Sequence, residues 1–231
     1  MADKKSKRVY GRRTGRPLNK ERSEALTRLY PTLEIPSNLL TEQADLDKAE
    51  LFGNKKPTWL EIGFGNGEHL LALMERHKEY NFIGAEPFIN GMSAFLKQLE
   101  SENSENIRVL MDDAMLIANS LSDETLAGIY ILNPDPWHKK RHHKRRIVND
   151  NNLDQFARIL EPGGLLIMST DVPDLAEWMV TMASRHPAFN WCASSYKDWK
   201  IAPSDWITTR YEEKGAKGAK SMTYLIFKKI K

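Results

Sequence analysis

The sequence has little cysteine and no long apolar stretch. Cys192 is the only cysteine among 231 residues, which excludes an internal disulfide and a Cys-x-x-Cys metal or redox site. Apolar runs such as 70–74 extend for about five residues, whereas a membrane-spanning helix needs about 20. The Lys/Arg-rich start is not followed by the apolar region of a secretory signal. These absences predict a soluble protein of a reducing, cytoplasmic compartment that has no membrane partner.

Positive charge is scarce over most of the chain and concentrated in two short segments. Residues 1–30 carry 10 Lys/Arg against 3 Asp/Glu, and residues 139–146 (KKRHHKRR) carry 6 Lys/Arg and no acid. The rest of the chain has a net charge of −10, although the whole chain is at +3. An acidic body with two basic segments predicts a polyanionic partner that is contacted at two places. The alternative is a solubilising tail and a solvated loop.

The pattern of apolar residues predicts one α/β domain. Residues 1–30 lack a clear apolar period and predict a basic, mobile arm, which leaves 31–231 as a single domain. Short apolar runs then alternate with helical periods about five times, so we expect a doubly wound, mostly parallel sheet with helices on both faces. Two closing strands without a clear helix between them predict an antiparallel edge hairpin. The expected strands are 58–62, 81–86, 107–111, 128–132, 165–170, one that begins at 189, and 222–229. The expected helices are 68–77, 88–100, 114–121 and 150–160, and the Pro-Gly-Gly sequence 162–164 is expected to end the last of these. A further helix is expected to start with a capping box of Asp174 and Glu177.

A glycine-rich loop directly follows the first expected strand. Gly63, Gly65 and Gly67 let the backbone turn tightly and approach a ligand, but the spacing is GxGxG rather than the GxGxxG of dinucleotide-binding proteins. Glu61, two residues before the loop, would repel a pyrophosphate. It suits a ligand without phosphate that carries an amino acid end and a sulfonium, which describes S-adenosylmethionine.

Two further acidic residues follow the next expected strands. Glu86 could accept hydrogen bonds from both ribose hydroxyls of such a donor, and Asp113 could accept one from the adenine amino group. Each residue alone is as readily explained by a helix cap or a solvated loop. Because Glu61 and the glycine loop lie at the same edge of the sheet, the four positions Glu61, Gly63, Glu86 and Asp113 together predict a donor-binding site.

The fourth expected strand ends in a rigid acidic turn. Pro134 and Pro136 lock the backbone on either side of Asp135. The first and fourth strands are neighbours in a doubly wound sheet, so we expect Asp135 to face the glycine loop and the reactive methyl group of the donor. His138 and His142 have the i, i+4 spacing of a metal pair, but the surrounding cations disfavour a metal ion. The basic run is therefore interpreted as a phosphate-binding stretch, and no metal is expected.

Several motifs, taken in order, resemble those of the bacterial tRNA (guanine-N7)-methyltransferases. They are the EIGFGNG loop from Glu61, the DPWHK turn that leads into KRR, the STD segment 169–171 and the TRYE segment 209–212. The resemblance covers roughly residues 58–231 and implies a seven-stranded, Rossmann-like class I fold, S-adenosylmethionine as donor and guanosine 46 of the tRNA variable loop as target. It also implies a catalytic position at Asp135, donor contacts from Glu61, Glu86, Asp113 and Asp135, and tRNA contacts from Lys139, Asp171, Thr209, Arg210, Tyr211 and Glu212. One position departs from the family pattern, because Asn133 precedes PDPW where many relatives have an aromatic or another small residue.

The target atom determines the expected mechanism. Guanine N7 has an in-plane lone pair and no proton near neutral pH, so it can attack the methyl sulfonium without a general base. Catalysis is then mainly alignment, which can be worth roughly 7–11 kcal/mol. We expect Asp135, together with Asp171 or Glu212, to accept hydrogen bonds from guanine N1–H and the exocyclic amine while N7 points at the methyl group.

Two other functions stay open from the sequence alone. The turn 133–137 is similar, with one residue inserted, to the Asn/Asp-Pro-Pro-aromatic turn of exocyclic-amine methyltransferases. The chain could also be a non-catalytic RNA-binding module with a vestigial donor site, although the intact carboxylates argue against that. The sequence is compatible with a monomer or a homodimer.

Overall fold

The computed structural model describes residues 10–99, 104–209, 211–213 and 221–230. None of the helices in these ranges is both long and apolar enough to cross a membrane. In chain order the elements are α1 (Lys20–Leu33), η1 (Ser37–Leu39), α2 (Lys48–Phe52), β1 (Thr58–Ile62), α3 (Glu68–Arg76), β2 (Asn81–Ala85), α4 (Ile89–Gln98), β3 (Ile107–Leu110), α5 (Ala114–Ser120), β4 (Leu126–Leu132), η3 (Lys140–Arg145), α6 (Asp150–Ile159), β5 (Leu160–Thr170), α7 (Pro173–Arg185), β6 (Phe189–Trp191), α8 (Lys197–Lys200) and β7 (Thr223–Lys229).

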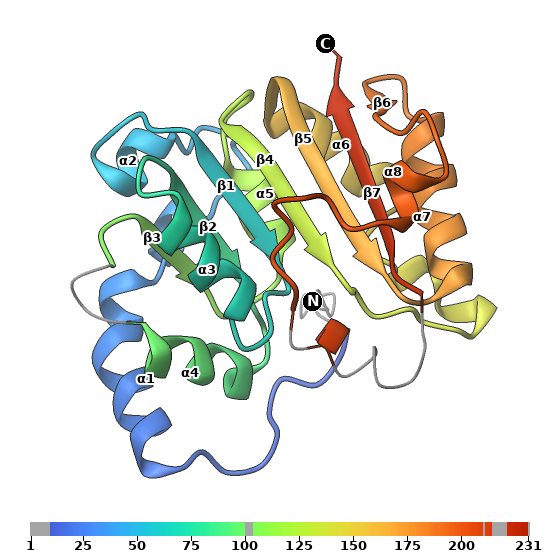
Figure 1. Cartoon of the computed structure of the whole chain (residues 1–231). Coiled ribbons are helices and arrows are strands. Elements are labelled where there is room, and N and C mark those ends of the chain that lie inside the picture. The colour runs from blue at the N-terminus through green and yellow to red at the C-terminus, as the bar shows by residue number, and fades with distance from the viewer. Residues whose placement is uncertain (1–9, 100–103, 210, 214–220, 231) are drawn as a thin grey trace, which may run out of the picture.

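Within the described residues, seven strands form one sheet in the order β3-β2-β1-β4-β5-β7-β6 (Figure 1). The strands from β1 to β5 pair in parallel, and Leu60 of β1 lies opposite Ile83 on one side and Ile129 on the other. β7 runs antiparallel to β5, and β6 runs antiparallel to β7 at the edge of the sheet. The predicted mostly parallel, doubly wound sheet with an antiparallel edge hairpin is therefore confirmed.

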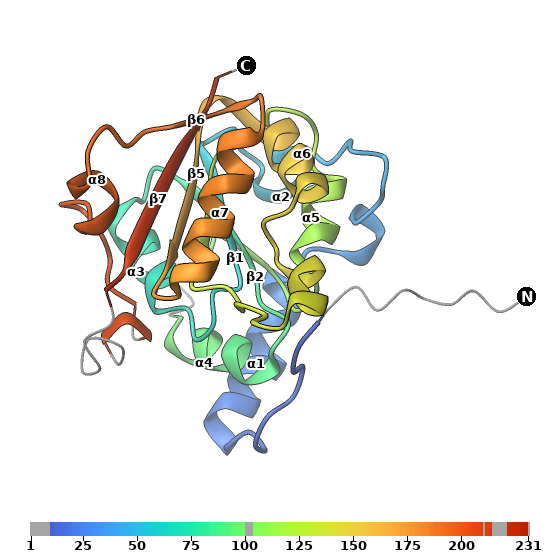
Figure 2. The ribbon, with the colours of Figure 1, turned by 90° about the vertical axis from the view of Figure 1, so that its right-hand side faces the viewer.

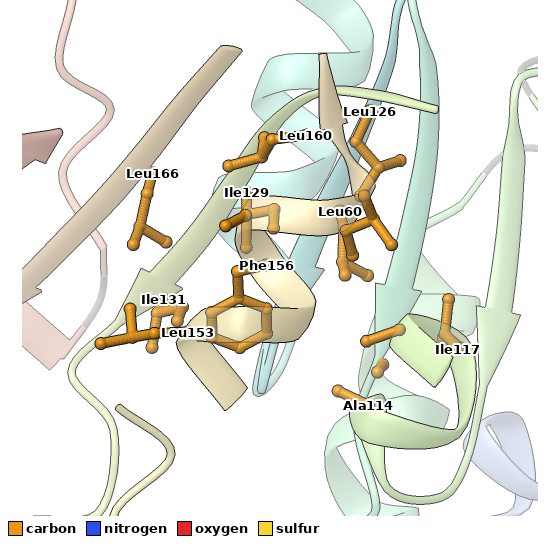
Figure 3. Packing of buried hydrophobic residues seen from close by; sticks show 14 of the residues in the cluster. Leu60, Ala114, Ile117, Leu126, Ile129, Ile131, Leu153, Phe156, Leu160 and Leu166 are labelled. Carbon is orange, nitrogen blue, oxygen red and sulfur yellow. The ribbon is translucent and has the colours of Figure 1, made fainter. Parts of the chain in front are cut away.

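Helices with apolar faces cover both sides of the sheet (Figure 2). One cluster of buried side chains joins β1, β4 and β5 to α5, α6 and α7. Figure 3 shows part of this cluster, where Leu153 and Phe156 of α6 lie close to Ile131 of β4. A second cluster joins α1, α3 and α4 to β2 and β3 on the opposite side. Because both faces are covered, most positions of β1 and β4 are buried, and β2 is buried at every position.

The N-terminal boundary differs from the prediction. α1 begins at Lys20, inside the stretch 1–30 that the sequence assigns to a mobile arm. Its apolar face, formed by Ala25, Leu29 and Leu33, is buried in the cluster that α1 shares with α4 and β3. The four-residue spacing of these side chains is a helical signal, but the charged residues between them obscured it. Residues 1–9 of the predicted arm lie outside the described residues.

Two element boundaries also differ from the sequence-based expectation. The Pro-Gly-Gly sequence 162–164 lies inside β5 rather than between a helix and a strand. α7 begins at Pro173 and has no side-chain cap, so the predicted capping box of Asp174 and Glu177 is wrong. The Asp174 carboxylate pairs with Arg146 instead, a partner that is distant in sequence and that no local pattern predicts.

We predict that Leu29→Ala lowers the free energy of unfolding by about 2–5 kcal/mol, because it removes a buried side chain from the contact between α1 and α4. Arg28→Ala is the matched control, since Arg28 is exposed on the same helix and its loss should change that free energy by less than about 0.5 kcal/mol. Urea denaturation followed by circular dichroism measures both variants. Equally small effects would show that α1 is not part of the cooperative core.

Candidate active site

A cleft of about 860 Å³ opens at the carboxyl ends of the central strands. It lies where the strand order reverses between β1 and β4, the usual ligand position in such sheets. Four of the predicted site residues line it, each after a different strand: Gly63 after β1, Glu86 after β2, Asp113 after β3 and Asp135 after β4. The fold therefore brings four separate loops to one cavity, which is large enough for a nucleoside-sized ligand.

The glycine loop between β1 and α3 is closely packed at one end and open at the other. Gly63, Gly65 and Gly67 have positive φ angles of 73°, 60° and 83°. A Cβ at Gly67 would lie 2.3 Å from Cδ2 of Phe95, whereas a Cβ at Gly63 would meet no heavy atom within 4 Å. The loop is thus fixed against α4 at Gly67 and leaves space at Gly63, which lines the cleft.

The Glu86 carboxylate connects the second strand to the glycine loop. It accepts hydrogen bonds from the backbone N–H groups of Gly65, at 2.7 Å, and Phe88, at 2.9 Å. Burial raises the pKa of Glu86 and the charges of Asp135 and Glu61 add to the shift, while the two hydrogen bonds oppose it. An ionised carboxylate can accept about four hydrogen bonds, so Glu86 keeps acceptor capacity for a ligand hydroxyl.

Glu61 occupies a different position from the other acidic residues. Its side chain is buried, and one carboxylate oxygen lies 2.9 Å from Nδ1 of His69 in α3. Glu61 does not belong to the residues that line the cleft, although its charge acts on Glu86. The sequence analysis did not predict the pairing with His69, and a contact between Glu61 and a donor stays a prediction.

Asp113 serves as a helix cap and also lines the cleft. Its carboxylate accepts a hydrogen bond from the backbone N–H of Met115 at 3.0 Å, at the start of α5. Its neighbour Asp112 forms an ion pair with Arg13 at 3.1 Å and also lines the cleft. The helix-cap interpretation and the donor-site interpretation of Asp113 are therefore compatible.

The turn that carries Asp135 is held in an uncommon backbone conformation. Asn133 and Trp137, on either side of it, have φ angles of 49° and 45°, in the left-handed region. Asparagine tolerates that region well, which gives a reason for Asn133, whereas a bulky Trp137 there is strained and must be held by its surroundings. Asp135 is accessible from the cleft, yet the protein atoms around it remove enough water to raise the pKa of its carboxyl group.

The segment before α1 forms part of the cleft wall. Tyr10, Gly11 and Arg12 line the cleft, and a Cβ at Gly11 would lie 3.8 Å from Oδ2 of Asp135. The Asn90 side chain at the start of α4 forms two hydrogen bonds with the backbone of this segment, both at 2.8 Å. Figure 1 shows the segment in dark blue as it passes from the strand ends to α1. The sequence analysis missed these site residues, for which the basic composition of the segment was the only signal.

The predicted tRNA-side residues in the tail lie beside the Asp135 turn. Glu212 is buried, accepts a hydrogen bond from Nε1 of Trp206 at 3.0 Å and lies 3.5 Å from Nδ2 of Asn133. The Tyr211 hydroxyl lies 3.4 Å from Oδ1 of Asp171, which follows β5. These contacts bring Tyr211 and Glu212 to the carboxyl ends of β5 and β4, respectively.

The other predicted tRNA-side residues have different surroundings. Oγ1 of Thr209 accepts a hydrogen bond from the backbone N–H of Glu212 at 3.2 Å, so Thr209 orders the local chain. Lys139 is exposed at the start of η3. Arg210 lies outside the described residues. The assignment of all these residues to tRNA stays a prediction.

The basic run has an exposed part and a buried end. Residues 139–141 are exposed, in agreement with a phosphate-binding stretch. The Arg145 guanidinium lies 5.0 Å from the ring centroids of both Tyr10 and Trp137, so it connects the N-terminal segment to the acidic turn. Arg146 is only 1% exposed. The phosphate-binding interpretation of the whole run therefore does not apply to Arg146.

Comparisons with known proteins agree with this arrangement. A family described as "Putative methyltransferase" matches residues 55–225. The tRNA (guanine-N(7)-)-methyltransferase of Rhodospirillum rubrum is 40% identical over 223 residues, which cover 96% of this chain and 88% of that protein. The protein of the same name from Brucella anthropi is 42% identical over 219 residues, which cover 94% and 93%. The chain belongs to the tRNA (guanine-N7)-methyltransferase family. The family and the enzyme class predicted from the motifs are confirmed.

Solved structures support the fold of this methyltransferase. The 16S rRNA methyltransferase KamB superposes with a TM-score of 0.54 at 12% identity, over 81% of this chain and 95% of that chain. The 16S rRNA (adenine(1408)-N(1))-methyltransferase from Catenulisporales acidiphilia gives a TM-score of 0.53 at 16% identity, again over 81% and 95%. At such low identity the similarity establishes the class I methyltransferase fold and nothing about the substrate.

The glycine loop yields a stability prediction. Gly63→Ala should lower the free energy of unfolding by about 1–2 kcal/mol, because only the strain of the left-handed conformation is added. Gly67→Ala adds a clash with the Phe95 ring and should cost about 2–5 kcal/mol. Thermal and urea unfolding of the two variants measures the difference. Equal losses would show that the loop is not packed against α4 at Gly67.

Proposed function

We propose that this methyltransferase transfers the methyl group of S-adenosylmethionine to N7 of guanosine 46 in the variable loop of tRNA. The observation that carries the proposal is the position of Asp135, which lines the same cleft as Gly63, Glu86 and Asp113. The curated relatives quoted above are named for methylation of guanine N7 in tRNA. The exposed basic residues 139–141 follow the Asp135 turn directly, where they can contact phosphates and orient the RNA.

The residues of the cleft fit S-adenosylmethionine. Glu86 is positioned to accept from the ribose hydroxyls, since its carboxylate has acceptor capacity left after the two backbone hydrogen bonds. The open space at Gly63 can take the methionine part close to the backbone. The charges of Glu61, Glu86 and Asp135 favour a donor that carries an amino group and a sulfonium over one that carries phosphates. When bound, the sulfonium supplies an electrophilic methyl group.

The contribution of the protein to the reaction is alignment. N7 attacks the methyl carbon as the carbon–sulfur bond breaks, and S-adenosylhomocysteine leaves with that electron pair. Asp135 holds the Watson–Crick edge of guanine by accepting from N1–H and the exocyclic amine, so that N7 points at the methyl group. Asp171, which follows β5 and lies next to the Tyr211 hydroxyl, and Glu212 of the tail, which lies next to Asn133, support this edge. Guanosine 46 must leave its tertiary contacts in tRNA, and the basic residues supply binding free energy for that opening.

The function is tested by methyl transfer to a defined tRNA. Purified protein is incubated with labelled S-adenosylmethionine and an unmodified tRNA transcript, then the RNA is treated with borohydride and aniline, which cleave the chain at N7-methylguanosine. We expect label incorporation with scission at position 46, and no scission in a transcript with adenosine at that position. Incorporation without scission would show that N7 is not the methylated atom and would favour an exocyclic-amine methyltransferase. No incorporation, with donor and tRNA both bound, would contradict the proposal.

Asp135→Asn should lower the single-turnover rate of methyl transfer by about 10²-fold or more, because the amide cannot accept from both guanine N–H groups. Asp150→Asn is the matched control, since Asp150 is an exposed acid at the start of α6. Rates are measured at saturating donor and tRNA. Full turnover by Asp135→Asn would exclude Asp135 as the residue that holds the guanine edge.

The basic segments predict a steep salt dependence of tRNA binding. If they neutralise six or more phosphates, the affinity should fall about 10³-fold between 50 and 200 mM salt. Lys140→Ala should reduce the slope of log K against log salt by about 1. Lys55→Ala is the control, because Lys55 is exposed before β1, at the opposite edge of the sheet from the cleft. Filter binding across a salt series measures each slope, and equal slopes for the two variants would contradict the assignment of η3 to tRNA.

A further inference from the structure

Arg146 is the largest fully buried side chain that the structure describes, and it lies at the end of a run of cations. It is 1% exposed, although it lines the cleft beside Asp135. Its Nε donates a hydrogen bond to the backbone carbonyl of Pro136 at 2.9 Å. Its Nη2 pairs with the Asp174 carboxylate in α7, and its guanidinium lies 5.0 Å from the ring centroid of Trp178 on the same helix.

Folding alone does not account for this charge. An arginine stays protonated in a protein, and the loss of hydration of a buried charge is often not fully offset by its ion-pair partner. The compensation here is incomplete, because Nη1 is buried and makes no hydrogen bond with the residues that the structure describes. The carboxylate of Asp174 is 61% exposed, so its attraction for the guanidinium is screened by water. An apolar side chain of similar volume would fill this space at lower cost.

The carbonyl that Arg146 holds belongs to the strained part of the acidic turn. Pro136 stands between Asp135 and Trp137, whose φ of 45° is unfavourable for a bulky residue. Such a conformation persists only where neighbouring groups hold it. The other end of the turn is fixed by a hydrogen bond of 2.8 Å from the Asn133 backbone N–H to the carbonyl of Ser169 in β5. Arg146 provides the corresponding contact at the far end.

On its other side, the Arg146 guanidinium contacts Asp174 and Trp178 of α7. The hydrogen bond and charge of Arg146 hold the pKa of Asp174 below its ordinary value, so Asp174 remains ionised and paired. Trp178 is itself fixed, since its Nε1 donates to the carbonyl of Val148 at 2.7 Å. Arg146 thus connects α7, which packs on the sheet, to the backbone next to Asp135.

We infer that Arg146 is a positioning residue for methyl transfer: it holds the Pro136 carbonyl against α7 and so fixes the turn that presents Asp135 to the guanine edge. It acts through the backbone and not by contact with RNA phosphates, unlike the exposed cations that precede it. The expected effect on the rate of methyl transfer rests on the proposed function. The contact between Arg146 and the Pro136 carbonyl does not depend on which base is methylated.

The test compares Arg146→Lys with Arg158→Lys. Lysine keeps the charge but cannot donate to Pro136 and Asp174 with the planar geometry of arginine. Arg158 is the matched control, because it is also largely buried and donates to the carbonyls of Ala118 and Leu121, at 2.7 Å each, away from the cleft. Asp174→Asn is a second variant that is mild enough to fold, since its carboxylate is mostly in water.

We expect Arg146→Lys to lower the single-turnover rate by about 10²-fold, while the dissociation constants for S-adenosylmethionine and tRNA change less than about 3-fold. Asp174→Asn should lower the rate in the same direction but by less. Arg158→Lys should lose thermal stability without loss of rate. A rate within about 3-fold of wild type for Arg146→Lys would overturn the inference. A loss confined to tRNA affinity, with a smaller salt slope, would make Arg146 a phosphate contact instead.

Hydrogen–deuterium exchange separates this inference from the proposed function. In Arg146→Lys, exchange of the Asn133 backbone amide, the protected amide of the turn that donates to the Ser169 carbonyl at 2.8 Å, should increase, while the hydrogen-bonded amides of the glycine loop 63–67 should be unchanged. This readout needs no substrate, so it stays decisive if wild-type protein methylates another atom or none. Unchanged exchange of the turn would show that Arg146 does not hold it, whatever reaction the enzyme performs.

Discussion

The reversal of strand order between β1 and β4 is the constraint on which the candidate site depends. Because the central strands are parallel, their carboxyl ends lie at one edge, and the loops after them must meet there. Gly63, Glu86, Asp113 and Asp135 come from four such loops and line one cleft. The four residues are far apart in sequence, and the strand order alone brings them together. The two buried clusters on opposite faces of the sheet fix that edge, so the packing of the fold determines the geometry of the site.

The carboxylates that meet at this edge disfavour one another. Burial raises the pKa values of Glu86 and Asp135, and the neighbouring negative charges add to the shift at Glu86. Such an arrangement lowers the stability of the empty site and is relieved by a cationic ligand. The proposed donor, with its sulfonium and amino group, would supply that relief, whereas a phosphate would add to the repulsion.

Much of this site could be predicted from local sequence, and the exceptions have a common cause. Gly63, Glu86, Asp113 and Asp135 each follow a recognisable strand, so the fold class was enough to bring them together. Tyr10, Gly11 and Arg12 reach the cleft through contacts of long sequence separation, and no periodicity marks them. α1 was missed because charged residues surround its apolar positions. The pairs Glu61–His69 and Arg146–Asp174 are tertiary contacts, and a local pattern favoured a different partner for Asp174.

The basic run 139–146 shows why composition alone can assign the wrong role to a charged residue. Six Lys/Arg within 139–146 read as one phosphate-binding surface, yet the chain turns through η3 and directs its last arginine into the protein. Exposed residues 139–141 can contact RNA, Arg145 lies against the rings of Tyr10 and Trp137, and Arg146 holds the Pro136 carbonyl. One short segment therefore joins the surface that would bind phosphates to the turn that would orient the base. Arg146 is therefore the contact by which the end of η3 is joined both to the backbone of that turn and to α7.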